Sequence, residues 1–278
     1  MELPPIVTAG WVLAHRDEVV VADVRWYLNG RSGRDAFTAA HVPGATFVDL
    51  EHDLSTPGEP TDGRHPLPSP EELAAALGRL GIGEHDVVIA YDDSGGGTAG
   101  RLVWMLRVIG HPAALLDGGL RAWPEPPSSG DGTVRPPTTF PPRPWPADRF
   151  AGHDEIVTAA ADPKAVVLDA RSAPRFAGED ASVDRRAGHI PGAGNAPWAA
   201  NLDPQTDRFR DAPALRQRFA DLGVGEDTEV ICYCGSGVSA CADLLALERA
   251  GVGRTRLYVP SWSGWSADPA RPAAQGRE

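Results

Sequence analysis

The chain has 278 residues, of which 42% are hydrophobic and 23% charged, so it holds enough apolar material for packed cores and too little charge for disorder. Its net charge of −12 and the lack of a basic run argue against nucleic acid as a partner. No stretch is long and apolar enough to cross a bilayer, and the N-terminus lacks the features of a signal peptide, so we expect a cytoplasmic protein that does not bind membranes.

Short β-branched runs alternate along the chain with helical stretches that end near glycine. This alternation is typical of right-handed βαβ units, in which buried strands form a parallel sheet and helices cover both faces. The predicted strands cover residues 19–24, 86–91, 165–170 and 228–233, and the clearest predicted helices cover 70–81 and 212–223. The fold class is therefore α/β, with doubly wound parallel sheets flanked by helices.

The two halves of the chain repeat one another. Four pairs of motifs recur in the same order, 142 to 148 residues apart: VVVADVRW with VVLDARSA, AAHVPGA with AGHIPGA, DVVIAYDD with TEVICYCG, and LLDGGLRAW with LYVPSWSGW. Between the halves lies a segment with nine prolines, which suits an extended connection. We therefore expect an N-terminal domain (1–123), a Pro-rich linker (124–149) and a C-terminal domain (150–278).

The three cysteines lie within ten residues, at positions 232, 234 and 241. Such a cluster does not resemble a disulfide framework. Cys234 follows a predicted strand and begins the loop Cys-Gly-Ser-Gly-Val-Ser before a predicted helix that ends at Gly251. A tight loop with two glycines at this place can turn backbone N–H groups inward and favour a thiolate. Cys234 is therefore the candidate nucleophile, whereas Cys232 and Cys241 are expected to be structural.

Three other chemistries of this cysteine loop are disfavoured. Cys232 and Cys234 have no second Cys or Cys/His pair to complete a zinc site, so we expect no metal and no cofactor. A cysteine-dependent phosphatase needs an arginine six positions after the nucleophile, where this chain has Ala240. A papain-like protease needs a histidine partner, and none lies near Cys234 in the sequence.

The motifs together resemble the two-domain rhodanese and 3-mercaptopyruvate sulfurtransferases. The resemblance extends from Val19 to Trp265 and depends on GHIPGAGN, DAR followed by RF, CGSGVSA, WMLRVIGH, GGLRAW and SWSGW. It implies two rhodanese-like domains, only the second of which carries the nucleophile; in the first half, Asp92 takes the position of Cys234. It also implies that Cys234 accepts a sulfane sulfur as a persulfide and passes it to cyanide or to a thiol, such as thioredoxin or a low-molecular-weight thiol.

The resemblance further predicts the sulfur donor. The thiosulfate-preferring loop of the family carries two basic residues after the cysteine, whereas CGSGV resembles the mercaptopyruvate-preferring form. We therefore favour 3-mercaptopyruvate over thiosulfate, and keep thiosulfate:cyanide sulfurtransfer by the same mechanism as the alternative. A third hypothesis, from another class, is a non-catalytic tandem rhodanese that binds a partner or senses oxidation through Cys234.

Candidate site residues follow from the same resemblance. Arg175 matches the first arginine that grips the donor, and Arg185 or Arg186 must serve as the second. A Ser–His–acid relay would consist of Ser236, His65 and Glu51, where Glu51 departs from the aspartate of the family and has Asp49 and Asp53 as neighbours. The loop residues that would hold the transferred sulfur are Gly235, Gly237, Val238 and Ser239.

Two paired motifs are expected to be structural. His41 and His189 recur in both halves although only one half has the cysteine, which favours a role in a turn over chemistry. Asp23 and Asp169, each at a strand end before an arginine, are predicted to accept hydrogen bonds that fix the following loop.

Overall fold

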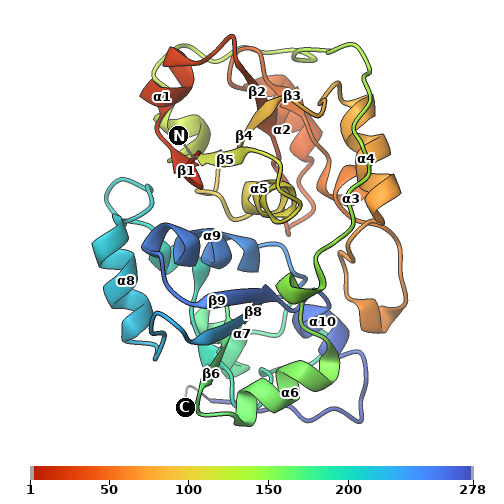
Figure 1. Cartoon of the computed structure of the whole chain (residues 1–278). Helices are drawn as coiled ribbons and strands as arrows, with labels where there is room; N and C mark the ends of the chain where they lie inside the picture. The colour runs from red at the N-terminus through yellow and green to blue at the C-terminus, as the bar shows by residue number, and fades with distance from the viewer. Residues whose placement is uncertain (1–2, 277–278) are drawn as a thin grey trace. The chain divides into compact units, whose positions relative to one another are not determined.

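The computed structural model describes residues 3–276, which divide into two compact units (Figure 1). The first unit contains residues 3–56, 67–145 and 204–209, and the second contains residues 57–66, 146–203 and 210–276. Each unit thus includes a short segment from the other half of the repeat. No helix among residues 3–276 is long and apolar enough to span a membrane.

The first unit contains a five-stranded sheet in the order β1-β5-β4-β2-β3, with every pair parallel. Apart from Asp23 at the end of one of them, the central strands consist of apolar residues or tyrosine and are almost entirely buried, as expected for a sheet with helices on both faces. The strands are β1 (Ile6–Val7), β2 (Val19–Asp23), β3 (Thr46–Phe47), β4 (Val87–Tyr91) and β5 (Ala113–Leu116).

Four helices of the first unit begin at a residue whose side chain accepts a hydrogen bond from the first turn: Thr8, Ser32, Asp49 and Ser69. In α4 (Pro70–Arg79), Ser69 and Glu72 form a capping box and Pro70 occupies the first turn, so the prediction of a helix from residue 70 is confirmed. The other helices are α1 (Ala9–Ala14), α2 (Gly33–Ala39), α3 (Leu50–Asp53), α5 (Ala99–Val108) and the 3₁₀ turn η2 (Gly119–Ala122).

The second unit repeats this architecture with a parallel sheet in the order β7-β6-β8-β9. In Figure 1, α9 lies over one face of this sheet and α6 over the other. The strands are β6 (Ala165–Asp169), β7 (Gly194–Asn195), β8 (Glu229–Tyr233) and β9 (Arg254–Leu257). The helices are η1 (Pro60–Asp62), η3 (Ala147–Arg149), α6 (His153–Ala161), α7 (Ala173–Ala177), η4 (Trp198–Asn201), α8 (Ala212–Ala220), α9 (Ala240–Ala250) and α10 (Ser261–Trp265).

The Pro-rich segment after Pro124 packs along the first unit up to Trp145. Backbone hydrogen bonds join Ser128 to His41 in both directions, Thr133 N–H to Ala45 O, and Thr138 N–H to Gly78 O. An extended segment with few N–H donors can follow a surface in this way because it needs only occasional backbone partners.

Candidate active site

Cys234 lies between the carboxyl end of β8 and the start of α9, and its side chain is buried. The loop is anchored by the start of α10: Trp262 N–H donates to Cys234 O at 2.9 Å, and Ser263 N–H donates to Gly235 O at 2.9 Å. The carboxyl ends of parallel strands are the usual place for ligands in α/β folds. The loop is therefore a fixed platform at the expected edge of the sheet.

Ser261 holds the backbone of the nucleophile in place. Its φ is +53°, a left-handed conformation that a residue with a side chain seldom adopts. Its Oγ accepts a hydrogen bond from Cys234 N–H at 3.2 Å and donates one to Tyr258 O at 3.0 Å. The equivalent residue of the first unit is Gly119, with φ +55°. The sequence analysis missed Ser261, although the match of GGLRAW to SWSGW places it opposite a glycine.

The first unit contains a copy of the cysteine loop in which a carboxylate replaces the thiol. Asp92 is 1% exposed, and its two oxygens accept four backbone hydrogen bonds. The donors are Ser94 N–H at 2.9 Å, Gly96 N–H at 2.8 Å, Thr98 N–H at 2.8 Å and Ala99 N–H at 2.9 Å. A loop of this sequence pattern therefore folds into a cradle of N–H groups that binds an anion.

The cradle has its counterpart in the second unit. At the offset of 142 residues, the N–H groups that hold Asp92 correspond to those of Ser236, Val238, Ala240 and Cys241. Cys241 N–H donates to Val238 O, whereas no described residue accepts a hydrogen bond from the backbone N–H of Ser236, Val238 or Ala240. All three residues are buried. Buried N–H groups nearly always have an acceptor, so this loop is built to receive one.

Ser236 forms a pair with His65. A 2.8 Å hydrogen bond joins Ser236 Oγ to His65 Nδ1, and both side chains are buried. His65 lies in the segment 57–66, which belongs to the second unit although it comes from the first half of the chain. Glu51 lies in the first unit, where its Oε1 accepts a hydrogen bond from Trp26 Nε1 at 3.1 Å. The pairing of His65 with Ser236 is thus present, and the role of Glu51 stays a prediction.

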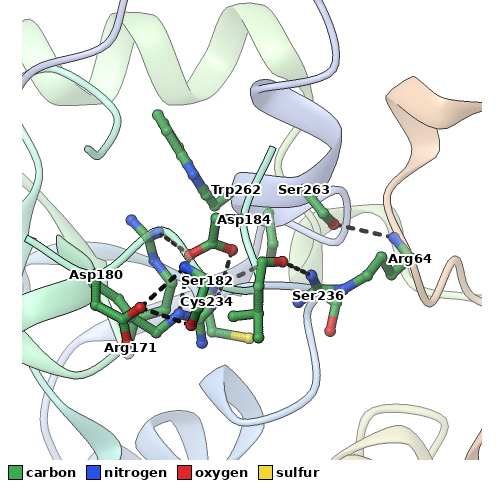
Figure 2. A network of polar contacts seen from close by, with 12 residues as sticks. Arg64, Arg171, Asp180, Ser182, Asp184, Cys234, Ser236, Trp262 and Ser263 are labelled. Atoms are coloured by element: carbon green, nitrogen blue, oxygen red, sulfur yellow. Dashed lines mark hydrogen bonds and ion pairs between the residues drawn. The ribbon is translucent and has the colours of Figure 1, made fainter. Parts of the chain in front are cut away.

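Close contact with α10 fixes the segment that carries His65. A Cβ atom on Gly63, whose φ is +90°, would lie 2.5 Å from Pro260 O, and one on Gly264 would lie 2.5 Å from Thr61 O. Arg64 N–H donates to Ser263 Oγ at 3.0 Å (Figure 2). Only glycine allows two backbones to approach this closely. The segment is therefore held against the same helix that anchors the cysteine loop.

Arg175 belongs to an ion-pair network with Asp184 and Arg171, which are labelled in Figure 2 together with Cys234. Its Nε and Nη2 donate to Asp184 at 2.9 and 2.6 Å, and Arg171 Nη1 reaches the same carboxylate at 3.2 Å. Arg171 is also paired with Asp169 at 2.6 Å. The side chain of Arg175 remains 15% exposed, whereas those of Arg171 and Asp184 are each 1% exposed. Asp184 thus orients Arg175 toward the loop.

The two other predicted arginines have different surroundings. Arg186 donates to Asp268 O and Arg271 O, and its guanidinium lies 5.9 Å from the centre of the Trp262 ring. Arg185 is exposed. An arginine that the sequence analysis did not single out, Arg64, lies beside the loop instead: a Cβ atom on Gly235 would be 2.9 Å from Arg64 Nη2 and 2.9 Å from Arg175 Nη2.

Comparison with known proteins places this geometry in a family. The model of the rhodanese-like domain matches residues 8–125 and again residues 153–268. The chain belongs to the rhodanese family. It is 40% identical over 286 residues to a Pseudomonas aeruginosa protein named "Probable 3-mercaptopyruvate sulfurtransferase", covering 99% of this chain and 100% of that one.

Two further relatives are also named as sulfurtransferases. A Mycobacterium tuberculosis protein named "Putative thiosulfate sulfurtransferase SseB" is 39% identical over 283 residues, covering 99% of this chain and 95% of that one. The 3-mercaptopyruvate sulfurtransferase from Leishmania major has a similar structure, with a TM-score of 0.83 and 30% identity, covering 95% of this chain and 74% of that one. This rhodanese is therefore an enzyme, a sulfurtransferase, and the predictions of its fold class, of its tandem organisation and of sulfurtransferase chemistry are confirmed.

The remaining cysteines of this rhodanese are enclosed by the protein. Cys232 is buried inside β8, and burial raises the pKa of its thiol well above the usual value. Cys241 lies in the first turn of α9, where its Sγ donates to Gly237 O at 3.4 Å. Both environments disfavour a thiolate or leave the sulfur inaccessible.

The repeated His and Asp motifs are structural in both rhodanese domains. His41 Nδ1 is hydrogen bonded to Phe37 O, and His189 Nδ1 to Phe176 O, each at 2.8 Å. Each histidine ring also stacks on the ring of the phenylalanine to which it is hydrogen bonded. Asp23 and Asp169 each accept hydrogen bonds from the arginine two residues later. The prediction that these motifs fix loops is confirmed.

Proposed function

We propose that this sulfurtransferase takes sulfane sulfur from 3-mercaptopyruvate onto Cys234 and passes it to a thiol or to cyanide. The observation that carries the proposal is the buried hydrogen bond between Ser236 Oγ and His65 Nδ1, on the loop that begins with Cys234. A donor whose sulfur is a protonated thiol needs a group that handles that proton. A hydroxyl paired with an imidazole is suited to this work.

The first step transfers sulfur to Cys234. The Cys234 thiolate attacks the sulfur of mercaptopyruvate, the carbon–sulfur bond breaks, and its electron pair stays on carbon as the enolate of pyruvate. The thiol proton of the donor leaves by way of Ser236 and His65 and is delivered to that carbon. The products are pyruvate and a Cys234 persulfide, with no external oxidant or reductant.

The loop amides would stabilise the persulfide. In Asp92, the oxygens that accept four N–H groups lie two bonds beyond Cβ. The outer sulfur of a persulfide on Cys234 also lies two bonds beyond Cβ. The backbone N–H groups of Ser236, Val238 and Ala240 are the equivalent donors, and such preorganised donors stabilise an anion without supplying a proton. Gly235, Gly237 and Ser239 complete the turn.

The second step regenerates the enzyme. An acceptor thiolate, of thioredoxin or of a low-molecular-weight thiol, or a cyanide ion attacks the outer sulfur of the persulfide. The sulfur–sulfur bond breaks, and its electron pair returns to Cys234 as a thiolate.

Thiosulfate is the second candidate donor, because guanidinium groups of Arg64 and Arg175 lie near Gly235 and suit a dianion. Its outer sulfur carries no proton. Transfer to Cys234 would release sulfite and would not need His65.

Mass spectrometry after treatment with each donor tests the proposal. One added sulfur on the peptide that holds Cys234 is expected after mercaptopyruvate treatment, and Cys234→Ser should abolish it, whereas Cys232→Ser and Cys241→Ser should keep most activity. His65→Ala should lower turnover with mercaptopyruvate by about 10²-fold or more and affect thiosulfate less. A persulfide on Cys241, or equal losses for both donors in His65→Ala, would contradict the proposal.

A further inference from the structure

The connection that follows β2 in the first unit is longer than its counterpart in the second unit. Arg25 and Arg171 are equivalent, because each binds the aspartate two residues before it and the carbonyl oxygen that precedes the repeated histidine. Phe37 and Phe176 are equivalent, because each stacks on that histidine. Twelve positions separate Arg25 from Phe37, whereas five separate Arg171 from Phe176, so the first unit has seven additional residues here.

The additional residues line a pocket of about 420 Å³ in the first unit. Its lining comes from within residues 25–34, which follow β2, and from within residues 47–51, which begin at the end of β3. These two strands are parallel neighbours (Figure 1), so the pocket lies at the carboxyl edge of the sheet. This edge is the usual place for ligands in α/β folds, and the volume suits a small molecule.

Hydrogen bonds and close backbone contact hold the walls of this pocket in place. Tyr27 O–H donates to Asp93 Oδ2 at 2.6 Å, and Gly30 N–H donates to Tyr27 O at 3.2 Å. A Cβ atom on Gly33 would lie 2.0 Å from Arg25 O, an approach that only glycine permits. The start of α2 is therefore fixed against the end of β2.

Two arginines of the pocket lie over aromatic rings. Cζ of Arg31 is 4.6 Å from the centre of the Tyr27 ring, and Cζ of Arg34 is 4.1 Å from the centre of the Phe47 ring. A ring beneath a guanidinium attracts the cation and leaves the N–H donors at its edge available. Among residues 3–276, no carboxylate forms an ion pair with Arg31 or Arg34, and no atom accepts a hydrogen bond from either guanidinium.

The other charged groups of the pocket have partners. Arg25 is paired with the aspartate that ends β2. Asp49 Oδ1 accepts hydrogen bonds from two N–H groups at the start of α3, and Glu51 Oε1 accepts one from an indole N–H. Both carboxylates lie on the α3 side of the pocket, whereas Arg31 and Arg34 lie on the α2 side. The α2 side therefore carries two positive charges that no carboxylate among residues 3–276 pairs with.

We propose that this pocket binds a small organic anion, whose carboxylate or phosphate group contacts the guanidiniums of Arg31 and Arg34. Guanidinium forks bind both kinds of oxyanion through paired hydrogen bonds. Trp26 and Leu28, whose side chain is 45% exposed, supply apolar surface for the rest of the molecule. The inference goes beyond the proposed function and does not depend on which sulfur donor the enzyme uses.

Calorimetric titration of the protein with benzoate and with phenyl phosphate tests the proposal. The tighter of the two probes shows whether the site prefers a carboxylate or a phosphate, and benzyl alcohol, which has the ring without the charge, should bind at least about 10-fold more weakly. The double variant Arg31→Gln/Arg34→Gln should weaken binding of the tighter probe about 10-fold or more, because charged hydrogen bonds are lost. Arg31→Lys/Arg34→Lys should recover part of the loss, and the matched control Arg254→Gln, at an exposed position of β9, should bind like the wild type.

Protection from phenylglyoxal, which modifies accessible arginines, locates the site in the wild type and does not depend on the folding of a variant. Peptide mass spectrometry should show Arg31 and Arg34 reacting in the free protein. At ten times its dissociation constant the probe leaves about one tenth of the sites free, so both reactions should slow about 10-fold while that of Arg254 is unchanged.

Equal affinity of the wild type and Arg31→Gln/Arg34→Gln for the tighter probe would overturn the proposal. Arg31 and Arg34 that still react at full rate in the presence of the probe would overturn it as well, because the anion would then bind elsewhere. Equally tight binding of benzyl alcohol would show recognition of the ring and not of the anion, and would also overturn it.

Discussion

Removal of the Asp92 carboxylate tests whether this type of loop is a cradle for anions. Four backbone N–H groups donate to Asp92 at 2.8 to 2.9 Å, and the side chain is 1% exposed. Asp92→Ala deletes both acceptors and leaves four buried donors without a partner. Asp92→Asn keeps one oxygen but places an NH₂ group against two of the donors.

The expected loss of stability follows from these contacts. A hydrogen bond to a charged group contributes about 1.5 to 3 kcal/mol, so four would give at least about 6 kcal/mol. Water that enters the space left by the side chain restores part of this free energy. The destabilisation caused by a single substitution rarely exceeds about 4 to 5 kcal/mol. We therefore expect Asp92→Ala to lower the free energy of unfolding by about 3 to 5 kcal/mol, and Asp92→Asn by a similar amount.

Urea denaturation followed by circular dichroism measures this loss, with Asp131→Ala, at an exposed position, as the matched control. Addition of formate should restore part of the stability of Asp92→Ala, because formate and the alanine methyl together replace the lost side chain. Losses below about 1 kcal/mol in both Asp92 variants would show that the amides of this loop contribute little. The cradle proposed around Cys234 would then lose its best parallel within the chain.

Three further predictions concern other groups. Arg175→Lys keeps the charge but loses the fork that grips Asp184 and the donor, so steady-state kinetics should show a raised KM for mercaptopyruvate with a smaller change in kcat; unchanged kinetics would remove Arg175 from the site. Burial, with a smaller effect of Arg143, lowers the pKa of His111 to about 4, below its unfolded value near 6.5, so stability is fully present above pH 6.5 and falls toward pH 4. Urea unfolding should show the wild type losing about 3 kcal/mol more than His111→Gln over this range, and parallel profiles would reject the assignment. Ser261→Ala leaves Cys234 N–H without its acceptor and should lower the free energy of unfolding by about 1 to 3 kcal/mol, whereas Ser261→Gly relieves the positive φ and should lose less; the reverse order would contradict this reading.

Local pattern was sufficient to predict most of the fold. The β-branched runs at 19–24, 86–91, 165–170 and 228–233 contain β2, β4, β6 and β8, and the helix predicted from residue 212 is α8. Apolar strands and capped helices are determined by neighbouring residues, so short windows of sequence reveal them. The internal repeat also identifies Asp92 as the counterpart of Cys234, so the N–H groups that bind Asp92 indicate which N–H groups surround Cys234.

The parts of the site that depend on distant residues were harder to predict. Arg185 and Arg186 are predicted because the second donor-binding arginine of the family follows the first by about nine residues, whereas in the structure Arg186 donates to Asp268 O and lies over the Trp262 ring. The left-handed backbone at Ser261 has no sequence signal of its own, since serine is an unusual residue at positive φ. Only the three-dimensional positions distinguish an arginine that supports the fold from one that faces the nucleophile.

The segment of residues 57–66 links two properties of the proposed site. It places Arg64 beside Gly235 and, one residue later, His65 on Ser236. Because adjacent residues share one backbone, the contact of Gly63 with Pro260 fixes the backbone that carries both the Arg64 guanidinium and the imidazole that would handle the thiol proton. Mercaptopyruvate brings a thiol proton to this segment, whereas thiosulfate brings none. Preference for the keto acid would thus depend on this segment as well as on the sequence of the cysteine loop.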